Sequence, residues 1–318
     1  MPALSHRTRR SFLAQSALAA AGASLFSRLA FSADGAPHVQ FPADPRERVA
    51  IASYPFRDFI LGPRDGAAPQ KMDLKDFAAH CGERFNIRKV EPWNRHFRST
   101  DAKYLEEFRA SVHNARGAVV NIAVDGDHSL YAADASERDQ AVAFSKKWID
   151  VAVAIGSPSV RTNIAEAKDS KPDLDRAADS LKRVAEFAAT KNVVVHVEND
   201  NPIAEDPFFL VQLIEKVNSP WLHSNPDFCN TLVTGREEYA YKGIAAMFQH
   251  AYGICHVKDM ENNEKGQVFR VDMPRTFGIL KRANYRGYCS MEFDASGDPY
   301  PGTAALIAQT LQYLGSAA

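Results

Sequence analysis

The chain alternates short apolar runs with longer segments in which apolar residues recur every three or four positions. The runs predict buried strands and the periodic segments predict amphipathic helices. The expected strands are 49–54, 87–91, 118–124, 159–163, 192–198, 221–227, 253–256 and 288–292. The expected helices are 73–85, 101–116, 136–155, 172–190, 207–217, 237–250, 274–283 and 303–314. Strict alternation of eight strands with eight helices predicts an α/β protein with a (β/α)8 TIM barrel.

The barrel is expected to occupy residues 48–318, preceded by a linker over 34–47 that is rich in Pro and Asp. An open, doubly wound sheet is the alternative fold for the same alternation of elements. The chain has no G-x-G-x-x-G after its first expected strand, which argues against a dinucleotide-binding sheet.

Residues 1–33 have the pattern of a targeting signal. They combine the pair Arg9-Arg10 with a short, weakly apolar stretch over 18–26, which is too short to cross a membrane. The segment from Thr8 to Leu13 resembles the twin-arginine export motif, and small residues near Ala33 offer a cleavage point. We therefore expect a periplasmic protein without membrane insertion after cleavage; a disordered basic arm or an uncleaved anchor are the alternatives.

Composition and charge exclude some classes of function. The 318 residues carry 38 basic and 39 acidic side chains, a formal net charge of −1. Nucleic-acid-binding proteins usually present a strongly basic face, so no nucleic-acid partner is expected. The four cysteines form no C-x-x-C pair and are expected to be buried free thiols.

Four metal-ligating residue types stand at the ends of the last four expected strands: Glu198, Asp227, His256 and Glu292. The carboxyl ends of parallel strands meet at one end of a barrel, so these side chains are expected to converge. Three carboxylates and an imidazole would repel one another strongly unless a cation lay among them. The pattern therefore predicts a site for one divalent metal ion with oxygen and nitrogen ligands.

The motifs around these residues resemble the xylose-isomerase-like barrel superfamily of sugar isomerases and epimerases, also described as the sugar phosphate isomerase/epimerase family. They are Val197-Glu198-Asn199, Pro226-Asp227, His256-Val257-Lys258-Asp259 and Met291-Glu292-Phe293. The resemblance implies that the four residues bind one divalent ion. Manganese is the expected ion, and magnesium, cobalt and zinc are the alternatives. It also implies that Glu198 and Glu292 act as bases on opposite sides of a substrate carbon.

The activity implied is a metal-dependent sugar isomerase or epimerase. Such an enzyme removes a proton next to a carbonyl and passes through an enediolate. The chain departs from the family in the substrate shell: Asn230 and Asn262 replace a histidine and an arginine of several epimerases. Ala204, with Glu205 beside it, stands where a further glutamate is common. The substrate and the reaction type therefore stay open.

Other polar and aromatic residues near strand ends are expected to bind a small carbohydrate. They are Tyr54, Glu91, Trp93, Arg161, Asn163, His196, Asn230 and Lys258, with His128 joining Tyr54 and Trp93 in an apolar platform. For His196, an equally good interpretation is a core histidine whose hydrogen bonds are satisfied within the protein. Instead of binding substrate, Lys258 could form an ion pair with Asp259 or Glu292. Arg161 and Asn163 could support Glu198 instead.

Three other functions remain as alternatives. A lyase of the same superfamily would cleave 3-keto-glycosides by elimination, with the same metal and carboxylates, and export favours it because glycosides occur outside cells. A sugar-binding barrel without activity is opposed by the complete ligand set. A three-zinc DNA-repair endonuclease needs many more histidines, and neither the net charge nor the export signal suits it. The oligomeric state is left open.

Overall fold

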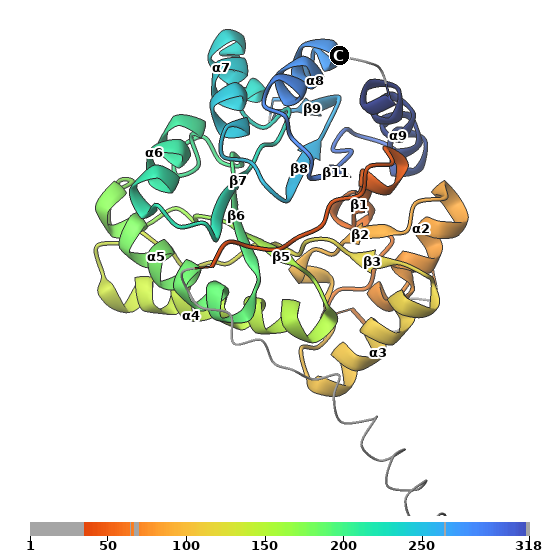
Figure 1. Cartoon of the computed structure of the whole chain (residues 1–318), viewed down its shortest axis with the longest axis horizontal. Helices are drawn as coiled ribbons and strands as arrows, with labels where there is room; N and C mark the ends of the chain where they lie inside the picture. Colours follow the sequence, from red (N-terminus) through yellow and green to blue (C-terminus); the bar gives the residue numbers. More distant parts are fainter. Residues whose placement is uncertain (1–34, 64, 67–69, 264, 316–318) are drawn as a thin grey trace, which may run out of the picture.

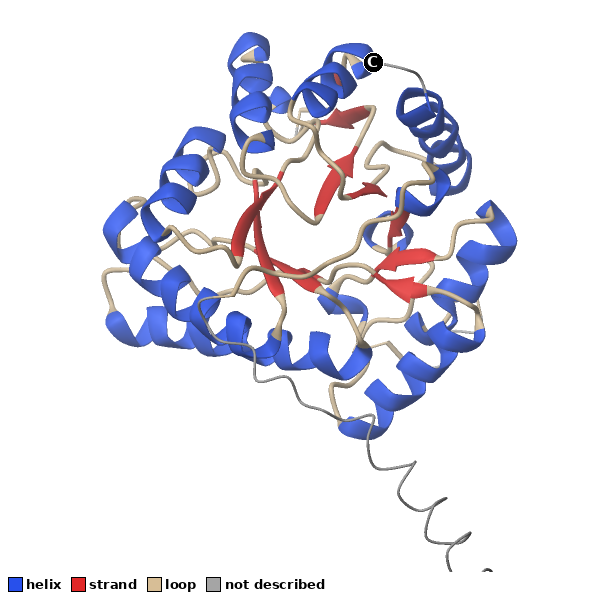
Figure 2. Ribbon diagram, in the orientation of Figure 1, coloured by secondary structure: helices blue, strands red, loops and turns tan. Residues whose placement is uncertain are grey.

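A computed structural model describes residues 35–315 except 64, 67–69 and 264. A ring of helices surrounds parallel strands (Figures 1 and 2), and the predicted (β/α)8 barrel is confirmed. The barrel strands are β1 (Val49–Ala52), β2 (Lys89–Glu91), β3 (Ala118–Val119), β4 (Ala123–Val124), β5 (Ser159–Thr162), β6 (Val194–Glu198), β7 (Leu222–Asn225), β8 (Ile254–Val257) and β11 (Tyr288–Met291). The helices are α2 (Phe77–Phe85), α3 (Ala102–Asn114), α4 (Ala135–Ile155), α5 (Leu174–Lys191), α6 (Pro207–Val217), α7 (Glu237–Phe248), α8 (Met273–Arg282) and α9 (Pro299–Gly315). None of these helices has the length and apolarity needed to cross a membrane.

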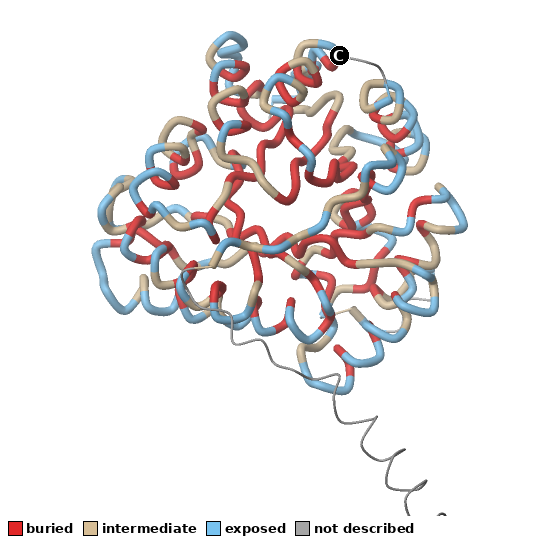
Figure 3. The backbone as a smooth tube through the Cα atoms, viewed as in Figure 1, coloured by how far each residue is buried: buried red, intermediate tan, exposed pale blue. Residues whose placement is uncertain are grey.

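The strands form two parallel arcs, ordered β3-β2-β1-β11-β8 and β4-β5-β6-β7. Isolated parallel bridges join the arcs, between Trp93 and Ala123 on one side and between Asp227 and His256 on the other. The bridges close the arcs into a barrel. Buried residues fill the strands and the inner faces of the helices, while the outer helix faces are exposed (Figure 3).

The third expected strand, 118–124, is the main correction to the predicted elements. It divides into β3, which pairs with β2, and β4, which pairs with β5. The backbone changes partners between them: the N–H of Val120 donates to Val90, whereas that of Ile122 donates to Ser159. One continuous apolar run thus serves both arcs, and sequence periodicity does not show where the partner changes.

A short antiparallel hairpin, formed by β9 (Met260–Asn262) and β10 (Val268–Arg270), follows β8 and was not predicted. Its residues are mostly polar and show no clean alternation, because the hairpin is only partly buried above the barrel end. It brings Glu261 beside the loop that follows β11, through a bridge between Glu261 and Asp294.

The helices begin where the sequence supplies acidic caps. The carboxylates of Asp101, Asp134, Asp173, Asp206 and Asp272 each accept a hydrogen bond from a backbone N–H of the first turn. Such a cap typically stabilises a helix by about 1 kcal/mol. The caps fix where each loop from a strand end becomes a helix, and those loops carry much of the site.

Residues 35–45, which we call the N-terminal strap, cross the amino end of the barrel and appear as the red trace in Figure 1. Trp221 Nε1 donates to the carbonyl of Gly35 at 2.7 Å. The Phe41 ring meets the rings of Tyr252 and Tyr288 edge-on at 5.3 and 5.7 Å. The expected linker is therefore irregular but docked. The expected export signal lies outside the described residues.

Candidate metal centre and substrate cavity

The four expected ligands converge at the carboxyl end of the barrel. Glu198 ends β6, Asp227 follows β7, His256 lies in β8 and Glu292 follows β11. All four are buried, and one ligand atom from each lies within 4.8 Å of the others. Hard carboxylate oxygens with one imidazole nitrogen suit a divalent ion such as magnesium, manganese, cobalt or zinc.

His256 is held from both sides. Its Nδ1 lies 2.6 Å from Glu198 Oε1 and 3.2 Å from Glu292 Oε2, while its Nε2 lies 3.0 Å from Glu91 Oε2. Burial opposes a charged imidazole, but these carboxylates outweigh it and raise the pKa of His256 well above its usual range. A cation is therefore strongly favoured at this position, and Nδ1 is the nitrogen that faces the other ligands.

Glu91 has a different place from the one expected. Its carboxylate is fully buried beneath His256 and does not line the cavity. Asn121 Nδ2 donates to Glu91 at 2.7 Å, and Ser159 Oγ donates to Asn121 Oδ1 at 2.6 Å. Burial would raise the pKa of Glu91, but His256 outweighs it and lowers the value. A carboxylate on the far nitrogen of a ligating histidine fixes the ring and strengthens the ligand, so Glu91 is a positioning residue rather than a sugar contact.

Asp227 fits a cation ligand by its hydrogen bonding. Its Oδ1 accepts from the backbone N–H groups of Cys229 and Asn230 at 2.8 and 2.7 Å. Its Oδ2 is buried and has no hydrogen-bond partner among the described residues. Burial raises the pKa of Asp227 to about 7. Lys258 Nζ lies 3.7 Å from this oxygen, beyond hydrogen-bond distance. A buried carboxylate oxygen without a hydrogen bond is rare in proteins, and a metal ion would satisfy it.

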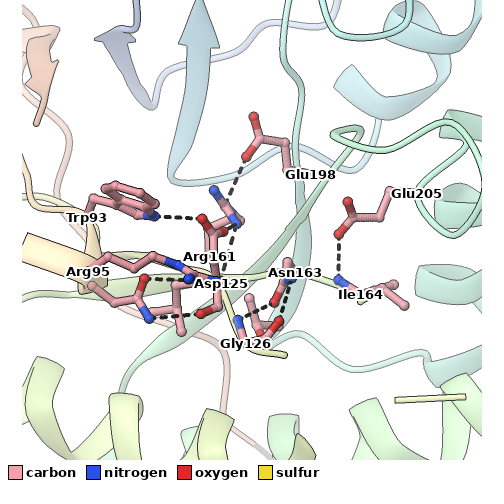
Figure 4. Close-up of polar contacts among 12 residues, drawn as sticks. Trp93, Arg95, Asp125, Gly126, Arg161, Asn163, Ile164, Glu198 and Glu205 are labelled. Carbon is pink, nitrogen blue, oxygen red and sulfur yellow. Dashed lines mark hydrogen bonds and ion pairs between the residues drawn. The ribbon is translucent and has the colours of Figure 1, made fainter. Parts of the chain in front are cut away.

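Arg161 links Glu198 to the neighbouring strand end (Figure 4). Its Nε lies 2.9 Å from Glu198 Oε2, and its Nη1 donates to Asp125 Oδ1. Asp125 also accepts from Trp93 Nε1 at 2.6 Å. Burial and charge oppose each other at Asp125, and Arg161 keeps the pKa of this carboxyl below its ordinary value. The arrangement fixes the orientation of Glu198.

Lys258 is buried among acceptors on the other side of the site. Its Nζ donates to Asn230 Oδ1 at 2.7 Å and to Glu261 Oε2 at 3.2 Å, and lies 3.5 Å from Glu292 Oε2. Burial lowers the pKa of a lysine, but the surrounding carboxylates outweigh this effect and raise the pKa of Lys258. The expected ion pair with Glu292 is present.

A cavity of about 230 Å³ opens above the four ligands. Its lining residues are Tyr54, Trp93, Ala123, Asp125, Arg161, Glu198, Asp200, Asn230, Lys258, Glu261, Glu292 and Asp294. Five expected substrate-binding residues are among them, and the Tyr54 and Trp93 rings meet edge-on at 5.1 Å. The volume is below the ~300–1,000 Å³ usual for ligand pockets, so the cavity suits a small polar molecule.

Three other residues expected near a sugar lie away from the cavity. His196 is buried lower in the barrel, where its Nε2 accepts from the N–H of Gly253 at 3.2 Å. A Cβ at Gly253 would lie 2.8 Å from the imidazole, so only glycine admits the ring. Both amide atoms of Asn163 bond the backbone of Gly126, and His128 Nδ1 pairs with Glu137. The core-histidine interpretation of His196 is the one that fits.

Sequence reasoning missed four acidic residues that line the cavity: Asp125, Asp200, Glu261 and Asp294. Asp125, Asp200 and Asp294 follow the ends of β4, β6 and β11 by one to three residues, a position that could have indicated them. Glu261 depends on the unexpected hairpin. Glu205, noted beside Ala204, is buried away from the cavity, where Oε1 accepts from the N–H of Ile164 (Figure 4).

Solved structures share this fold at low sequence identity. A xylose isomerase-like TIM barrel protein from Mycobacterium smegmatis, in complex with magnesium, is 18% identical, with a TM-score of 0.64 and coverage of 89% of this chain and 98% of that chain. A D-allulose 3-epimerase from Methylomonas sp., in complex with D-allulose, is 16% identical (TM-score 0.62; 86% and 98% covered). A 3-keto-D-glucoside 4-epimerase from E. coli is 15% identical (TM-score 0.63; 83% and 99% covered).

Among curated proteins, none matches this chain in sequence. A family model does match: the xylose isomerase-like TIM barrel model aligns with residues 76–316, which include all four candidate ligands. The match covers most of the chain, and the barrel and its carboxylate–histidine group agree with it. The chain therefore belongs to the xylose isomerase-like TIM barrel family.

Proposed function

We propose that this protein is a divalent-metal-dependent carbohydrate isomerase or epimerase that removes a proton next to a carbonyl. The observation that carries the proposal is the convergence of Glu198, Asp227, His256 and Glu292 within 4.8 Å beneath a polar cavity. Manganese is the proposed ion, with magnesium, cobalt and zinc as alternatives. The structural similarity to ketose and keto-glucoside epimerases supports a carbohydrate substrate.

When bound, a divalent ion polarises the substrate carbonyl and stabilises the negative charge left by proton removal. The proton itself is moved by the protein. Glu198 and Glu292 reach the cavity from β6 and β11, which belong to different arcs of the barrel. One carboxylate takes the proton from one face of the carbon and the other returns it to the opposite face, which inverts that carbon. Arg161 orients Glu198 and Lys258 lies beside Glu292.

The metal centre is tested by replacing Asp227 with alanine. The variant should bind far less than one equivalent of metal and keep its circular dichroism spectrum. Asp127→Ala is the matched control, because Asp127 is an exposed carboxylate whose partner is Arg95. Full metal occupancy in Asp227→Ala, measured by elemental analysis, would remove the assigned centre.

A lyase acting on 3-keto-glycosides is the second candidate, since a keto-glucoside epimerase shares the fold. Both reactions begin with loss of the same kind of proton, but elimination then breaks a C–O bond. Metal-loaded protein should be incubated in deuterium oxide with free ketoses and with 3-keto-glycosides. An inverted product carrying deuterium supports the epimerase, whereas a released aglycone supports the lyase. An inactive sugar-binding barrel would do neither.

We further propose that the protein is exported to the periplasm through the twin-arginine pathway. The motif around Arg9 and Arg10 supports this proposal. Replacement of both arginines by lysine should leave precursor in the cytoplasm, as measured by fractionation and immunoblotting. Mature protein at the wild-type level in the periplasm of that mutant would contradict the proposal.

A further inference from the structure

The cavity carries more negative than positive charge. Six carboxylates line it, from Asp125, Glu198, Asp200, Glu261, Glu292 and Asp294, against the two cations of Arg161 and Lys258. The formal excess of the lining residues is four negative charges. With the carboxylate of Asp227, which faces the proposed centre, the excess is five, and a divalent ion bound there would leave three. Charges in a cleft with low-dielectric walls repel ligands of the same sign more strongly than charges on an open surface.

Neither cation is available to an anionic ligand. The Arg161 guanidinium lies between Glu198 and Asp125 (Figure 4), and both of these carboxylates belong to the cavity wall. Lys258 is 4% exposed, and its Nζ lies within 4 Å of four carboxylates and donates a hydrogen bond to Asn230 Oδ1. A phosphate or carboxylate group entering the cavity would have to displace one of these pairs.

The loops after the seventh and eighth strands, which bind phosphate in many TIM barrels, each place a carboxylate in the cavity wall here. The seventh barrel strand is β8, and the hairpin after it carries Glu261; the eighth is β11, and its loop carries Asp294. A parallel bridge holds the two residues together. The next helices, α8 and α9, have Asp272 and Asp298 at their starts, and these carboxylates accept from first-turn N–H groups that could otherwise bind an anion.

We propose that Glu261 and Asp294 make this cavity selective for uncharged carbohydrates and exclude sugar phosphates and sugar acids. The inference rests on the proposed function and names its substrate class. Carboxylates accept hydrogen bonds from hydroxyl groups, so the residues that repel an anion serve a neutral polyol. Asp294 is itself placed by Arg57, whose Nη2 lies 3.3 Å from Oδ1.

The test uses inorganic phosphate as the anionic probe, with D-tagatose and D-tagatose 6-phosphate as a matched pair of neutral and anionic sugars. Manganese stoichiometry is measured first in each protein sample, and ligand dissociation constants follow by calorimetry. Burial raises the pKa of Glu261 to about 7, so the titrations are run at a pH well above this value, where the carboxylate is charged. Wild-type protein should bind phosphate and the phosphate ester at least about tenfold more weakly than the Glu261→Gln/Asp294→Asn variant does. Asp294→Asn alone, which leaves the hairpin sequence unchanged, should give an intermediate affinity. Glu238→Gln removes an exposed carboxylate that pairs with Arg275 and should have no effect.

The outcomes separate the two proposals. Tighter phosphate binding in the double variant, with unchanged manganese content, supports charge exclusion by these two residues. Equal phosphate affinity in wild-type and double-variant protein, both loaded with metal, would overturn this inference and leave the metal centre intact. Wild-type protein that binds no metal would remove the proposed function and this inference with it.

Discussion

The two ends of the barrel differ in the kind of side chain that they bury. At the carboxyl end, buried carboxylates, an imidazole and two cations lie close together, and one oxygen of Asp227 makes no hydrogen bond to the described residues. At the amino end, the N-terminal strap seals the barrel with aromatic contacts from Phe41. A buried charge lowers folding stability unless an opposite charge compensates it, whereas burial of apolar side chains raises folding stability. The comparison places binding chemistry at one end and stability at the other, as in other TIM barrels.

The largest effect is expected from Glu198→Gln and Glu292→Gln at the carboxyl end. Glutamine keeps the size and one oxygen ligand but cannot take a proton, and a general base typically contributes about 100-fold or more to the rate. Each variant should keep some metal and lose most turnover, with folding stability unchanged or increased. Steady-state kinetics on metal-quantified samples checks this. Near-normal turnover in both would leave the glutamates as ligands only.

Acid should lower the folding stability of the protein through His96, which lies behind the cavity wall at the carboxyl end of the barrel. Burial, helped by Lys71 and Arg57, lowers the pKa of His96 from 6.5 to about 4. The Ser53 hydroxyl accepts from the N–H of Trp93 and forms a hydrogen bond of 2.9 Å with His96 Nδ1. Burial favours the neutral form of the His96 ring. The folded state therefore binds fewer protons, and stability present above pH 6.5 is lost as the pH falls toward 4. The difference corresponds to about 3 kcal/mol.

The variant His96→Asn isolates this contribution, because asparagine can form a hydrogen bond with Ser53 without titrating. Urea unfolding at about pH 7 and about pH 4.5 should show a smaller loss of stability in the variant than in the wild type, by about 2 kcal/mol. Parallel losses in the two proteins would assign acid sensitivity to other groups.

At the amino end, Phe41→Ala should lower the free energy of unfolding by about 2 kcal/mol, below the usual cost for a fully buried phenylalanine because Phe41 is partly exposed. Metal affinity and turnover should stay at wild-type values. Ile203→Ala, at a side chain 54% exposed on a loop, is the control and should change stability little. A loss of metal binding in Phe41→Ala would break the separation between the two ends.

The smallest effect expected is that of Glu91→Gln on metal affinity. The variant keeps a hydrogen-bonding group on His256 Nε2 but loses the charge that strengthens the ligand, so the dissociation constant should rise about tenfold. Metal titration with a competing chelator measures it. Ser159→Ala, one step further along the same hydrogen-bond chain, should have a smaller effect. Unchanged affinity in Glu91→Gln would make Glu91 a core residue only.

The sequence predicted the barrel and the convergence of the four ligands because both follow from local patterns. Apolar runs mark strands, and a polar residue at a parallel strand end must lie at the carboxyl mouth. The split of 118–124 was not predictable, since both halves are equally apolar and only barrel closure divides them. His196 shows the same limit: alternation places it inside the barrel, but only the contact with Gly253 shows its depth. Glu261 reaches the cavity through a hairpin whose polar sequence carries no periodic signal.

The docking of Gly35 against Trp221 sets the position from which a tether joined at Gly35 would start. The carbonyl of Gly35 is fixed beside the start of β7, at the amino end, while the cavity opens at the carboxyl end. A tether joined to the protein at Gly35 would start on the face opposite the cavity. A protein held by a short tether at Gly35 would present its cavity away from the support, so immobilisation at this residue should leave diffusion of small molecules into the site unobstructed.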